Sequence, residues 1–587
     1  MKMLIKYLII FIIWVYGTAF GNDNSPNEMH IAIASEGNTD KGLHTEFSVF
    51  AFPLHEKLSI RAENLPPSAT LTDHKDGTAR FVWGSPVIGN HKIIFVASGP
   101  SGTYSKEFVL KVGDYGYPPE NAGPMIFPEF PPPASSEIIY VSSSGKDSNS
   151  GVKISPVTVK KALDLAREKV VSATKPVYIL FKRGDYWPGS GSLGIYENLK
   201  GKRDAPVVFG AYGEGDLPHF ESFISRASIE YLHFQDILFN QVRIHGNKYS
   251  SIPEKYPGTD IEKLVLEERY VVQRLRFHQC RFEREGLTFF NIFSSAGRGS
   301  RVPDSNGWWG GGPLAGMIRD IEIGHSVFLH IHRGGTPDAI NFTAVDRGVW
   351  IHHNLFKDTR EEHIDISGGY GHVIEHNLGL GTVTNNGIKL HSQFSLLTDS
   401  IIRNNTILYS GGWRGKPVGG SGNAFVALNT MGCKIIGNNF ISRWAAGYGD
   451  DDRIDDRGYF GTSAGNIIEG NIYGGGVQIV GFRKNTANKI TERNLFRNNL
   501  YRSWINDDKL LRFWNKQIGN KALVGKDITA ADFSEWVQLS VTGERYYKDL
   551  DDIFENPFNP KTPNQALDIQ NPGNWKRKPN LWKSCQY

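Results

Sequence analysis

The sequence predicts an all-β protein in which a small β-sandwich precedes a long parallel β-helix. Residues 29–113 contain short runs of alternating apolar and polar residues separated by turn residues, which is typical of an antiparallel sandwich. Six lines between residues 351 and 501 share one asparagine-bearing pattern, which indicates the stacked coils of a domain that we place over residues 138–505. Glycine is abundant, at 64 of 587 residues, and methionine is scarce, at 6, a composition that favours turn-rich β structure over helical bundles.

The bulk composition excludes several classes of protein. Hydrophobic residues make up 40% of the chain and charged residues 21%, which is ordinary for a soluble globular protein. The net charge is only +4 and no dense tract of lysine and arginine is present, so nucleic acid is not an expected partner. The three cysteines, Cys280, Cys433 and Cys585, form neither a disulfide framework nor a zinc pattern. Cys280 and Cys433 lie in segments with a strand-like pattern and are expected to be buried.

Residues 1–21 are expected to be a secretory signal peptide. The basic start "MKMLIKY" is followed by the short apolar core "LIIFIIWVY" and by small residues near the cleavage point after Gly21. The alternative is an uncleaved anchor, although the apolar core is short for a membrane-spanning helix. We therefore expect a secreted, periplasmic or cell-surface protein that is a monomer and has no stable membrane insertion after cleavage.

The strands expected in residues 29–113 include "TEFSVFAF", "TARFVWG" and "HKIIFVAS". This segment resembles the bacterial Ig-like modules found beside extracellular carbohydrate-active domains, which implies either a glycan-binding module or a spacer. Residues 114–137 follow as a proline-rich linker, and the prolines predict an extended, semi-rigid connection.

The β-helix is expected to start at residue 138. "IYVSSSGKDSNSG" leads into "SPVTVKKALDLAREKVV", a predicted amphipathic helix with Val159, Ala162, Leu163 and Ala166 facing inward. This text resembles the opening of secreted right-handed parallel β-helix proteins, in which such a helix caps the first coil.

Six lines of the repeat share an asparagine flanked by apolar residues. We align Asn354, Asn377, Asn405, Asn439, Asn471 and Asn499, which are separated by 23, 28, 34, 32 and 28 residues. A coil needs a little over twenty residues, so the longer gaps predict loops inserted on a coil. Asparagine suits this position because its side chain can hydrogen-bond to the main chain of the turn and to its counterpart one coil away. Residues 506–587 lose the repeat and are expected to form a C-terminal cap or tail.

A second set of strands aligns "DAINFT" (338–343), "EHIDIS" (362–367) and "NGIKLH" (386–391), each 24 residues after the last. This spacing stacks Asn341, Asp365 and Lys389 in one outward-facing column at the usual strand separation of about 4.7–4.9 Å. Thr343, Ser367 and His391 form a second column on the same face, and Asp338, Glu362 and Asn386 lie just before the strands. The columns predict a functional cleft.

The chemistry that fits this face is β-elimination on a polysaccharide that contains uronic acids. The C5 proton must be removed, which requires neutralisation of the uronate carboxylate by a Ca²⁺ ion or by asparagine and arginine side chains. Lys389 can serve as the base if a nearby positive charge or burial lowers its pKa, and His391 is the competing base or the acid. Glu362, Asp365 and Asp338 are the candidate Ca²⁺ ligands.

"NNGIKLHS", one coil after "EEHIDIS", resembles the lysine-base strand of parallel β-helix pectate lyases. The resemblance implies Lys389 as the base and Glu362 and Asp365 as calcium ligands. The chain departs from the family at Glu361-Glu362-His363, where the family has Asp-Asp, and after Lys389. For binding an acidic polysaccharide we name His363 and Asn341 together with Arg414 and Arg443, which fall on later loops.

These residues are compatible with four functions, namely a lyase, a hydrolase, an epimerase and an adhesin. The substrate of a lyase would be pectate, alginate or a glycosaminoglycan. A β-helix glycoside hydrolase would use paired acids from among Asp338, Glu362 and Asp365. A C5-epimerase shares the first proton abstraction with a lyase. A non-catalytic glycan-binding adhesin is the alternative that is not an enzyme.

Overall fold

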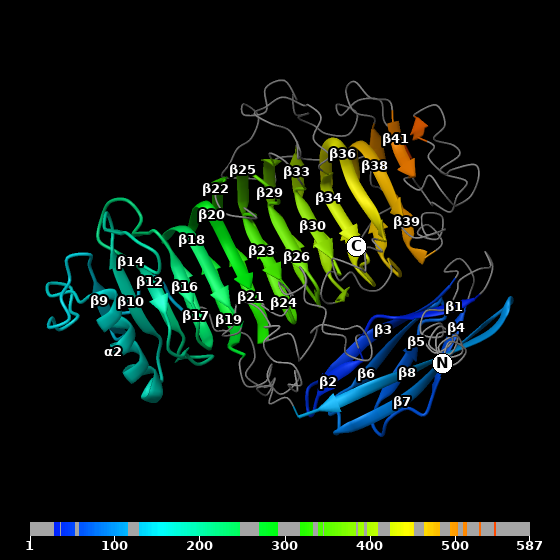
Figure 1. The fold of residues 1–587 in the computed structure, drawn as a ribbon, viewed down its shortest axis with the longest axis horizontal. Coiled ribbons are helices and arrows are strands. Elements are labelled where there is room, and N and C mark those ends of the chain that lie inside the picture. The colour runs from blue at the N-terminus through cyan, green and yellow to red at the C-terminus, as the bar shows by residue number, and fades with distance from the viewer. Residues whose placement is uncertain are drawn as a thin grey trace, which may run out of the picture.

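The computed structural model describes residues 29–35, 37–52, 58–114, 128–246, 269–290, 317–332, 338–343, 345–382, 386–392, 396–408, 423–450, 463–481, 493–502, 509–513, 527–529 and 545–546. Within these ranges the regular secondary structure is β-strand apart from one helix over residues 159–172 (Figure 1). No helix in these ranges is long and apolar enough to cross a membrane. The predicted signal peptide and most of the predicted linker lie outside the described residues.

The long domain is a parallel β-helix, as predicted. Its first sheet contains, in spatial order, β9 (Glu137–Val141), β10 (Val177–Lys182), β14 (Val207–Tyr212), β17 (Ile229–Gln235), β19 (Val271–His278), β21 (Met317–Gly324), β24 (Arg347–His352), β28 (Val373–Glu375), β32 (Ile401–Arg403), β35 (Lys434–Ile436), β37 (Ile467–Glu469) and β39 (Leu495–Arg497). Short strands β13 (Leu199–Lys200), β27 (Gly369–Tyr370) and β31 (Leu397–Thr398) join this sheet. Neighbouring strands pair in parallel, so each coil adds one strand to the stack (Figure 1).

The second sheet forms the rest of each coil. It contains β11 (Tyr186–Trp187), β12 (Leu193–Ile195), β15 (His219–Phe220), β16 (Phe223–Ser225), β18 (Leu238–His245), β20 (Arg281–Phe290), β22 (Val327–Ile331), β23 (Ile340–Thr343), β25 (Leu355–Thr359), β26 (Ile364–Ser367), β29 (Leu378–Thr382), β30 (Ile388–His391), β33 (Thr406–Leu408), β34 (Asn423–Leu428), β36 (Asn439–Asp450), β38 (Ile472–Gly481) and β40 (Leu500–Arg502). In the coils from β22 onward, a strand such as β25 is followed, after a turn, by a strand such as β26.

The interior of the coils is filled by apolar side chains stacked one coil above another. The rings of Phe209, Phe234 and Phe277 stack with centroids 4.6 and 4.7 Å apart. Cys280 and Cys433 are buried in the same core, and burial raises the pKa of each thiol to about 12. These two cysteines are therefore small core residues, as expected.

A ladder of asparagines occupies the turn between the first and the second sheet. Its members in the described coils are Asn354, Asn377, Asn405, Asn438, Asn471 and Asn499. Each of the first five donates a 3.0 Å hydrogen bond from its side-chain amide to the Oδ1 of the next. The predicted alignment through Asn439 is wrong by one residue. Asn439 is already the first residue of β36, where it pairs with Thr406, whereas Asn438 follows the left-handed Gly437 (φ 67°) of the turn.

The predicted amphipathic helix is present as α2 (Val159–Ser172), which packs against β9 and β10 at the start of the stack. It begins at Thr158, whose side-chain oxygen accepts a 3.2 Å hydrogen bond from the Lys161 amide. The helix buries Ala162, Leu163 and Ala166, as expected, and Val170. It thereby covers the apolar end of the first coil.

Residues 29–113 form two four-stranded sheets around a shared apolar core. One sheet contains β1 (His30–Ile33), β3 (Thr45–Phe52), β6 (Thr78–Trp83) and β5 (Thr70–Asp73), and the other contains β2 (Asn38–Asp40), β8 (Gly102–Gly113), β7 (Gly89–Gly99) and β4 (Ser59–Glu63). Phe47, Phe81 and Phe95 lie between the two sheets. The segment is therefore a β-sandwich.

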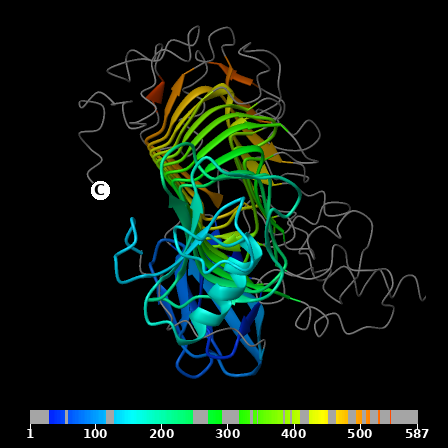
Figure 2. The same cartoon turned by 90° about the vertical axis from the view of Figure 1, so that its left-hand side faces the viewer.

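The sandwich packs against turns of the β-helix, and Figures 1 and 2 both show it beside the stack. Phe50 and Phe52 form an apolar cluster with Met431 and Ala464. A Cβ atom at Gly465 would lie 2.3 Å from the Phe50 ring, so this glycine leaves room for the contact.

Polar contacts surround the same apolar cluster. Asp399 lies 3.1 Å from Arg80 and accepts a 2.9 Å hydrogen bond from the Ser48 hydroxyl. The sandwich is thus fixed to the coils by both apolar and charged contacts.

The parallel pairing continues past the predicted boundary at residue 505. β41 (Lys509–Phe513) pairs in parallel with β38, and β43 (Arg545–Tyr546) pairs in parallel with β40. β42 (Asp527–Thr529) then runs antiparallel to β41. The described part of the C-terminal segment therefore adds strands to the second sheet.

Candidate active site

The polar columns lie on β23, β26 and β30, which belong to three consecutive coils. Asn341 pairs with Asp365 and Asp365 with Lys389 in the parallel register, one coil apart in each step of 24 residues. Thr343, Ser367 and His391 are paired in the same way. The stacking predicted from the spacing is therefore present.

Asp365 is the centre of this group of side chains. Its Oδ2 accepts a 2.9 Å hydrogen bond from the Lys389 ammonium, and its Oδ1 lies 2.8 Å from Nε2 of His391. Burial alone would raise the pKa of Asp365, but the charges and hydrogen bonds of Lys389 and His391 lower it well below its usual range. Asp365 is accordingly an ionised carboxylate that holds both candidate bases.

Asp338 and Glu362 lie in the turns just before β23 and β26, where they start a second ladder. Asp338 Oδ1 accepts a 3.0 Å hydrogen bond from the Glu362 amide, and Glu362 Oε1 accepts a 3.2 Å bond from the Asn386 side chain. Asn386 Oδ1 in turn accepts a 3.2 Å bond from the Asn423 amide. These acids therefore also join adjacent coils, as the asparagines of the first ladder do.

The residues present fit a hard divalent cation. Asp338, Glu362 and Asp365 are buried, and each offers one oxygen within 4.8 Å of the others. Ca²⁺ binds oxygens at about 2.3–2.6 Å, so ligand oxygens on opposite sides of an ion lie about 5 Å apart. Burial and then the neighbouring Glu362 charge raise the pKa of Asp338 well above its usual value, which is the effect that a bound cation would reverse.

Lys389 competes with a cation for the same oxygens. Its Nζ lies 2.9 Å from Asp365 and 3.7 Å from Glu362. The ion pair with Lys389 gives the Asp365 carboxylate a structural role of its own. The assignment of Asp365 as a metal ligand is therefore weaker than the assignments of Asp338 and Glu362.

The members of the site differ in their access to solvent. The Lys389 side chain is 21% exposed, whereas those of His391 and Glu362 are 3% and 2% exposed. Burial lowers the pKa of His391, although Asp365 acts in the opposite direction. Of these three side chains, that of Lys389 is thus the best placed to reach a substrate, whereas that of His391 is buried.

The other predicted binding residues are placed differently. Asn341 donates a 2.7 Å hydrogen bond to Asp338 and accepts a 2.8 Å bond from Thr343, so both ends of its amide contact the site itself. His363 is fully buried, with Nδ1 2.8 Å from the Thr359 hydroxyl and its ring 5.5 Å from that of Phe356. The burial of His363 argues against the predicted contact with substrate.

The two predicted arginines stay predictions. Arg414 lies outside the described residues, and Arg443 lies on β36 but its side chain is not among those described.

A group of histidines at the other turn of the coils was not predicted from the sequence. His325, His352 and His353 each offer a ring nitrogen, and these atoms lie within 4.8 Å of one another. The signal was available in "IGHSVF", "IHHNLF" and "IEHNLG", in which a histidine precedes the ladder position in three consecutive coils.

Comparisons with known proteins do not identify the chain. No protein-family model and no curated protein matches it. Among solved structures, a mannuronic acid specific polysaccharide family 6 lyase from human gut microbiota is similar at 12% identity and a TM-score of 0.37, over 71% of this chain and 87% of the other. A periplasmic alginate epimerase is similar at 8% identity and a TM-score of 0.24, over 70% of this chain and 83% of the other. Likenesses at this level do not assign a reaction to the chain.

Proposed function

We propose that the protein is a secreted polysaccharide lyase that cleaves a uronic-acid-containing polysaccharide by β-elimination. The observation that carries this proposal is the joining of Lys389 and His391 to Asp365, beside two further buried carboxylates on consecutive coils. A row of polar residues that runs along a stack of coils suits an extended polymer. The fold alone does not decide the function, so the proposal is based on these side chains.

In the proposed reaction, Lys389 removes the C5 proton of a uronic acid. The electron pair of the C5–H bond forms a C4–C5 double bond, the C4–O bond to the next sugar breaks, and the departing oxygen takes up a proton. Lys389 must be neutral to accept the proton, so the substrate complex must loosen its pairing with Asp365. A Ca²⁺ ion on Asp338, Glu362 and Asp365 would supply the positive charge that neutralises the uronate.

His391 is assigned a positioning role. Its side chain is 3% exposed and its Nε2 contacts Asp365, which also binds Lys389. We infer that His391 holds Asp365 in the orientation that places the Lys389 amine at the surface.

A hydrolase is less compatible with this geometry. Glycoside hydrolases need two carboxyl groups that reach the scissile bond from either side. Here Asp338, Glu362 and Asp365 are all buried, whereas Lys389 reaches solvent. An epimerase remains the nearest alternative, because it begins with the same proton abstraction.

The test is incubation of the purified protein with pectate, alginate and glycosaminoglycans. A lyase forms an unsaturated product that absorbs in the ultraviolet, and this is the expected result on one of these polymers. Reducing ends without that absorbance would instead indicate a hydrolase. Exchange of the C5 proton with deuterated water without cleavage would indicate an epimerase, and binding without any product would indicate an adhesin.

A further inference from the structure

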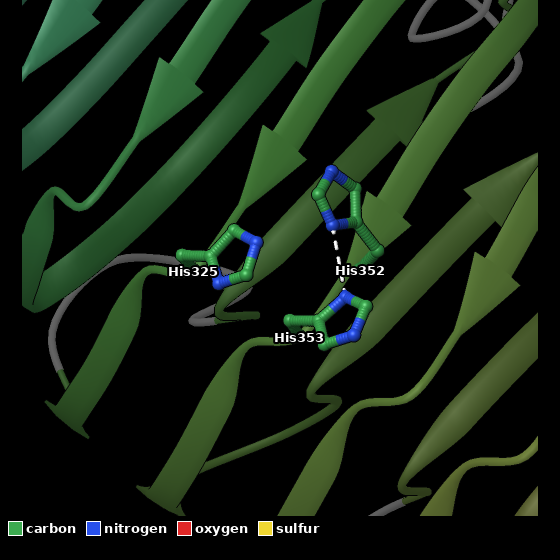
Figure 3. Close-up of side chains that lie close together, drawn as sticks. All are labelled: His325, His352 and His353. Atoms are coloured by element: carbon green, nitrogen blue, oxygen red, sulfur yellow. Dashed lines mark hydrogen bonds between the residues drawn. The ribbon is translucent and has the colours of Figure 1, made fainter. Parts of the chain in front are cut away.

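Three histidines gather where two neighbouring strands of the first sheet end. His352 is the last residue of β24, and His353 follows it in the turn before Asn354. His325 occupies the corresponding turn position after β21, one coil earlier. Figure 3 shows the three rings around a common space. The candidate active site lies on β26 and β30 of the other sheet, so the two groups share no residue.

The distances within this group suit a metal ion bound by imidazoles. Nδ1 of His352 lies 3.1 Å from Nδ1 of His353 (Figure 3). Nitrogen ligands at about 2.0–2.1 Å from a tetrahedral zinc ion are about 3.3 Å apart, so this pair already has nearly the required separation. His325 completes the set within 4.8 Å. Its ring is exposed, so it can rotate to bring its nitrogen closer.

A carboxylate supports His352 from the other side of the ring. Nε2 of His352 lies 3.1 Å from Oε1 of Glu322, and the Glu322 oxygen also accepts a 2.9 Å hydrogen bond from Arg276. In the tautomer in which the Nε2–H of His352 donates a hydrogen bond to Glu322, the lone pair on Nδ1 of His352 points towards His353. Metal-binding histidines almost always donate the N–H of their second ring nitrogen to a carboxylate, a backbone carbonyl or water.

Gly324 provides the space that the His352 ring occupies. A Cβ atom at Gly324 would lie 2.4 Å from the ring, and this glycine precedes His325 in the neighbouring coil. Its φ lies outside the left-handed region, so an alanine is compatible with the backbone and would act only by displacing the ring.

Stacking of a histidine column does not explain the whole arrangement. His325, His353 and His376 occupy equivalent turn positions, and their successive rings stack at 4.9 and 5.0 Å. His352 is not a member of that column, and its ring is nearly perpendicular to that of His353, at 82°. The edge-on approach of its Nδ1 to Nδ1 of His353 is a 3.1 Å hydrogen bond, and a metal ion bound by both nitrogens would replace the proton that they share.

We propose that His325, His352 and His353 bind a divalent transition-metal ion that prefers imidazole ligands, with zinc as the representative, and that Glu322 orients His352. Three histidines leave one position of a tetrahedral ion for water. Because His325 belongs to one coil and the other two to the next, the ion joins adjacent coils. This role is independent of the proposed lyase reaction.

The experiment uses the full chain after treatment with a chelator and dialysis. Zn²⁺ binding is measured by calorimetry, and Co²⁺ binding by the visible absorption of a four-coordinate site. We expect one equivalent of Zn²⁺ with a dissociation constant below about 1 μM. His325→Ala and His353→Ala should each weaken binding by more than about a hundredfold, and Gly324→Ala and Glu322→Gln by about 10 to 100-fold.

Two matched controls keep the proposal falsifiable. His376→Ala removes the next member of the stacked column, and Asp358→Ala disrupts a second group in which His330 and His332 lie 2.8 and 3.2 Å from Asp358. Both variants should bind Zn²⁺ within about threefold of the wild type. Zn²⁺ should also raise the melting temperature of the wild type but not of His353→Ala.

Three results would overturn the proposal. They are the absence of Zn²⁺ binding by the wild type, unchanged affinity in both His325→Ala and His353→Ala, or loss of binding in a control variant. Unchanged affinity in a folded Gly324→Ala protein would refute the assigned position of the His352 ring, because this variant keeps all three ligands.

Discussion

Replacing Asn438 by alanine should destabilise the β-helix far more than replacing its neighbour Asn439. Asn438 is fully buried, and its Oδ1 accepts 3.0 Å hydrogen bonds from both the backbone amide and the side chain of Asn405. Its Nδ2 donates to the Ile402 carbonyl at 2.9 Å and to Asn471 at 3.0 Å. Alanine at position 438 therefore removes the side-chain oxygen that the backbone amide of Asn405 bonds and the side-chain N–H that the Ile402 carbonyl accepts.

The magnitude follows from these groups. A buried polar group left without its partner costs about 1–3 kcal/mol, so two such groups give a loss of about 4 kcal/mol for Asn438→Ala. Asn439 donates a 3.1 Å hydrogen bond to the Thr406 hydroxyl, and Asn439→Ala should cost about 1 kcal/mol.

The assay is urea-induced unfolding of the two variants and the wild type, together with hydrogen exchange at the backbone amide of Asn405. That amide should exchange faster in Asn438→Ala and at the wild-type rate in Asn439→Ala. Equal destabilisation by the two substitutions, to within about 0.5 kcal/mol, would refute the assignment of Asn438 to the ladder.

Four further predictions concern Lys389, the metal ion, the contact between the sandwich and the coils, and His372, which is fully buried with its Nε2 3.0 Å from the Gly368 carbonyl oxygen. Lys389→Ala should lower turnover by about 10²–10⁴-fold without unfolding the protein, and Lys389→Arg should lose turnover as well because its guanidinium group stays protonated. His391→Ala should keep measurable turnover. If His391→Ala instead lost more turnover than Lys389→Ala, His391 would be the base. Removal of metal ions with a chelator should abolish cleavage of the polysaccharide. Added Ca²⁺ should restore cleavage, whereas added Zn²⁺ should not. Full activity after exhaustive chelation would count against a metal ion in the active site. Burial lowers the pKa of His372 to about 4, so its contribution to stability is present above its ordinary pKa of 6.5 and is lost as the pH falls towards 4. Its loss at about pH 5.5 is about 1.4 kcal/mol, measurable as proton uptake on unfolding. Phe50→Ala should lower the free energy that holds the sandwich to the coils by about 3 kcal/mol, so that the two parts unfold in two thermal transitions where the wild type shows one. A single unchanged transition would mean that this contact contributes little.

The spacing of the sequence was enough to predict the register of the candidate site. The strands that carry Asn341, Asp365 and Lys389 recur after 24 residues without an insertion, so the side chains that share a column could be counted directly. The asparagine ladder was harder, since "GNN" offers two adjacent asparagines and only the turn geometry distinguishes them. Gly437 takes the left-handed position, and the next residue, Asn438, therefore turns into the ladder.

Burial and partners were less accessible to sequence analysis. His363 follows two acids and precedes a polar column, yet its ring lies in the core, in space left by Gly379. The ion pair between Asp365 and Lys389 also depends on side-chain conformation and not on spacing alone. The group around His352 was missed because the coil of His325 carries Ser326 at the ladder position, so "IGHSVF" was not aligned with the asparagine-bearing lines.

The contact between the sandwich and the coils has a consequence for biosynthesis. Ser48 and Asp399 are hydrogen-bonded across 351 positions of the chain. The sandwich is synthesised first, and domains generally fold in that order, whereas the turns that receive Phe50 and Phe52 include residues 431 and 464. The aromatic face must therefore stay exposed while most of the coils are being made. Its burial occurs only once those late coils have formed, so a chain that stalls earlier displays an apolar patch that chaperones and proteases can recognise.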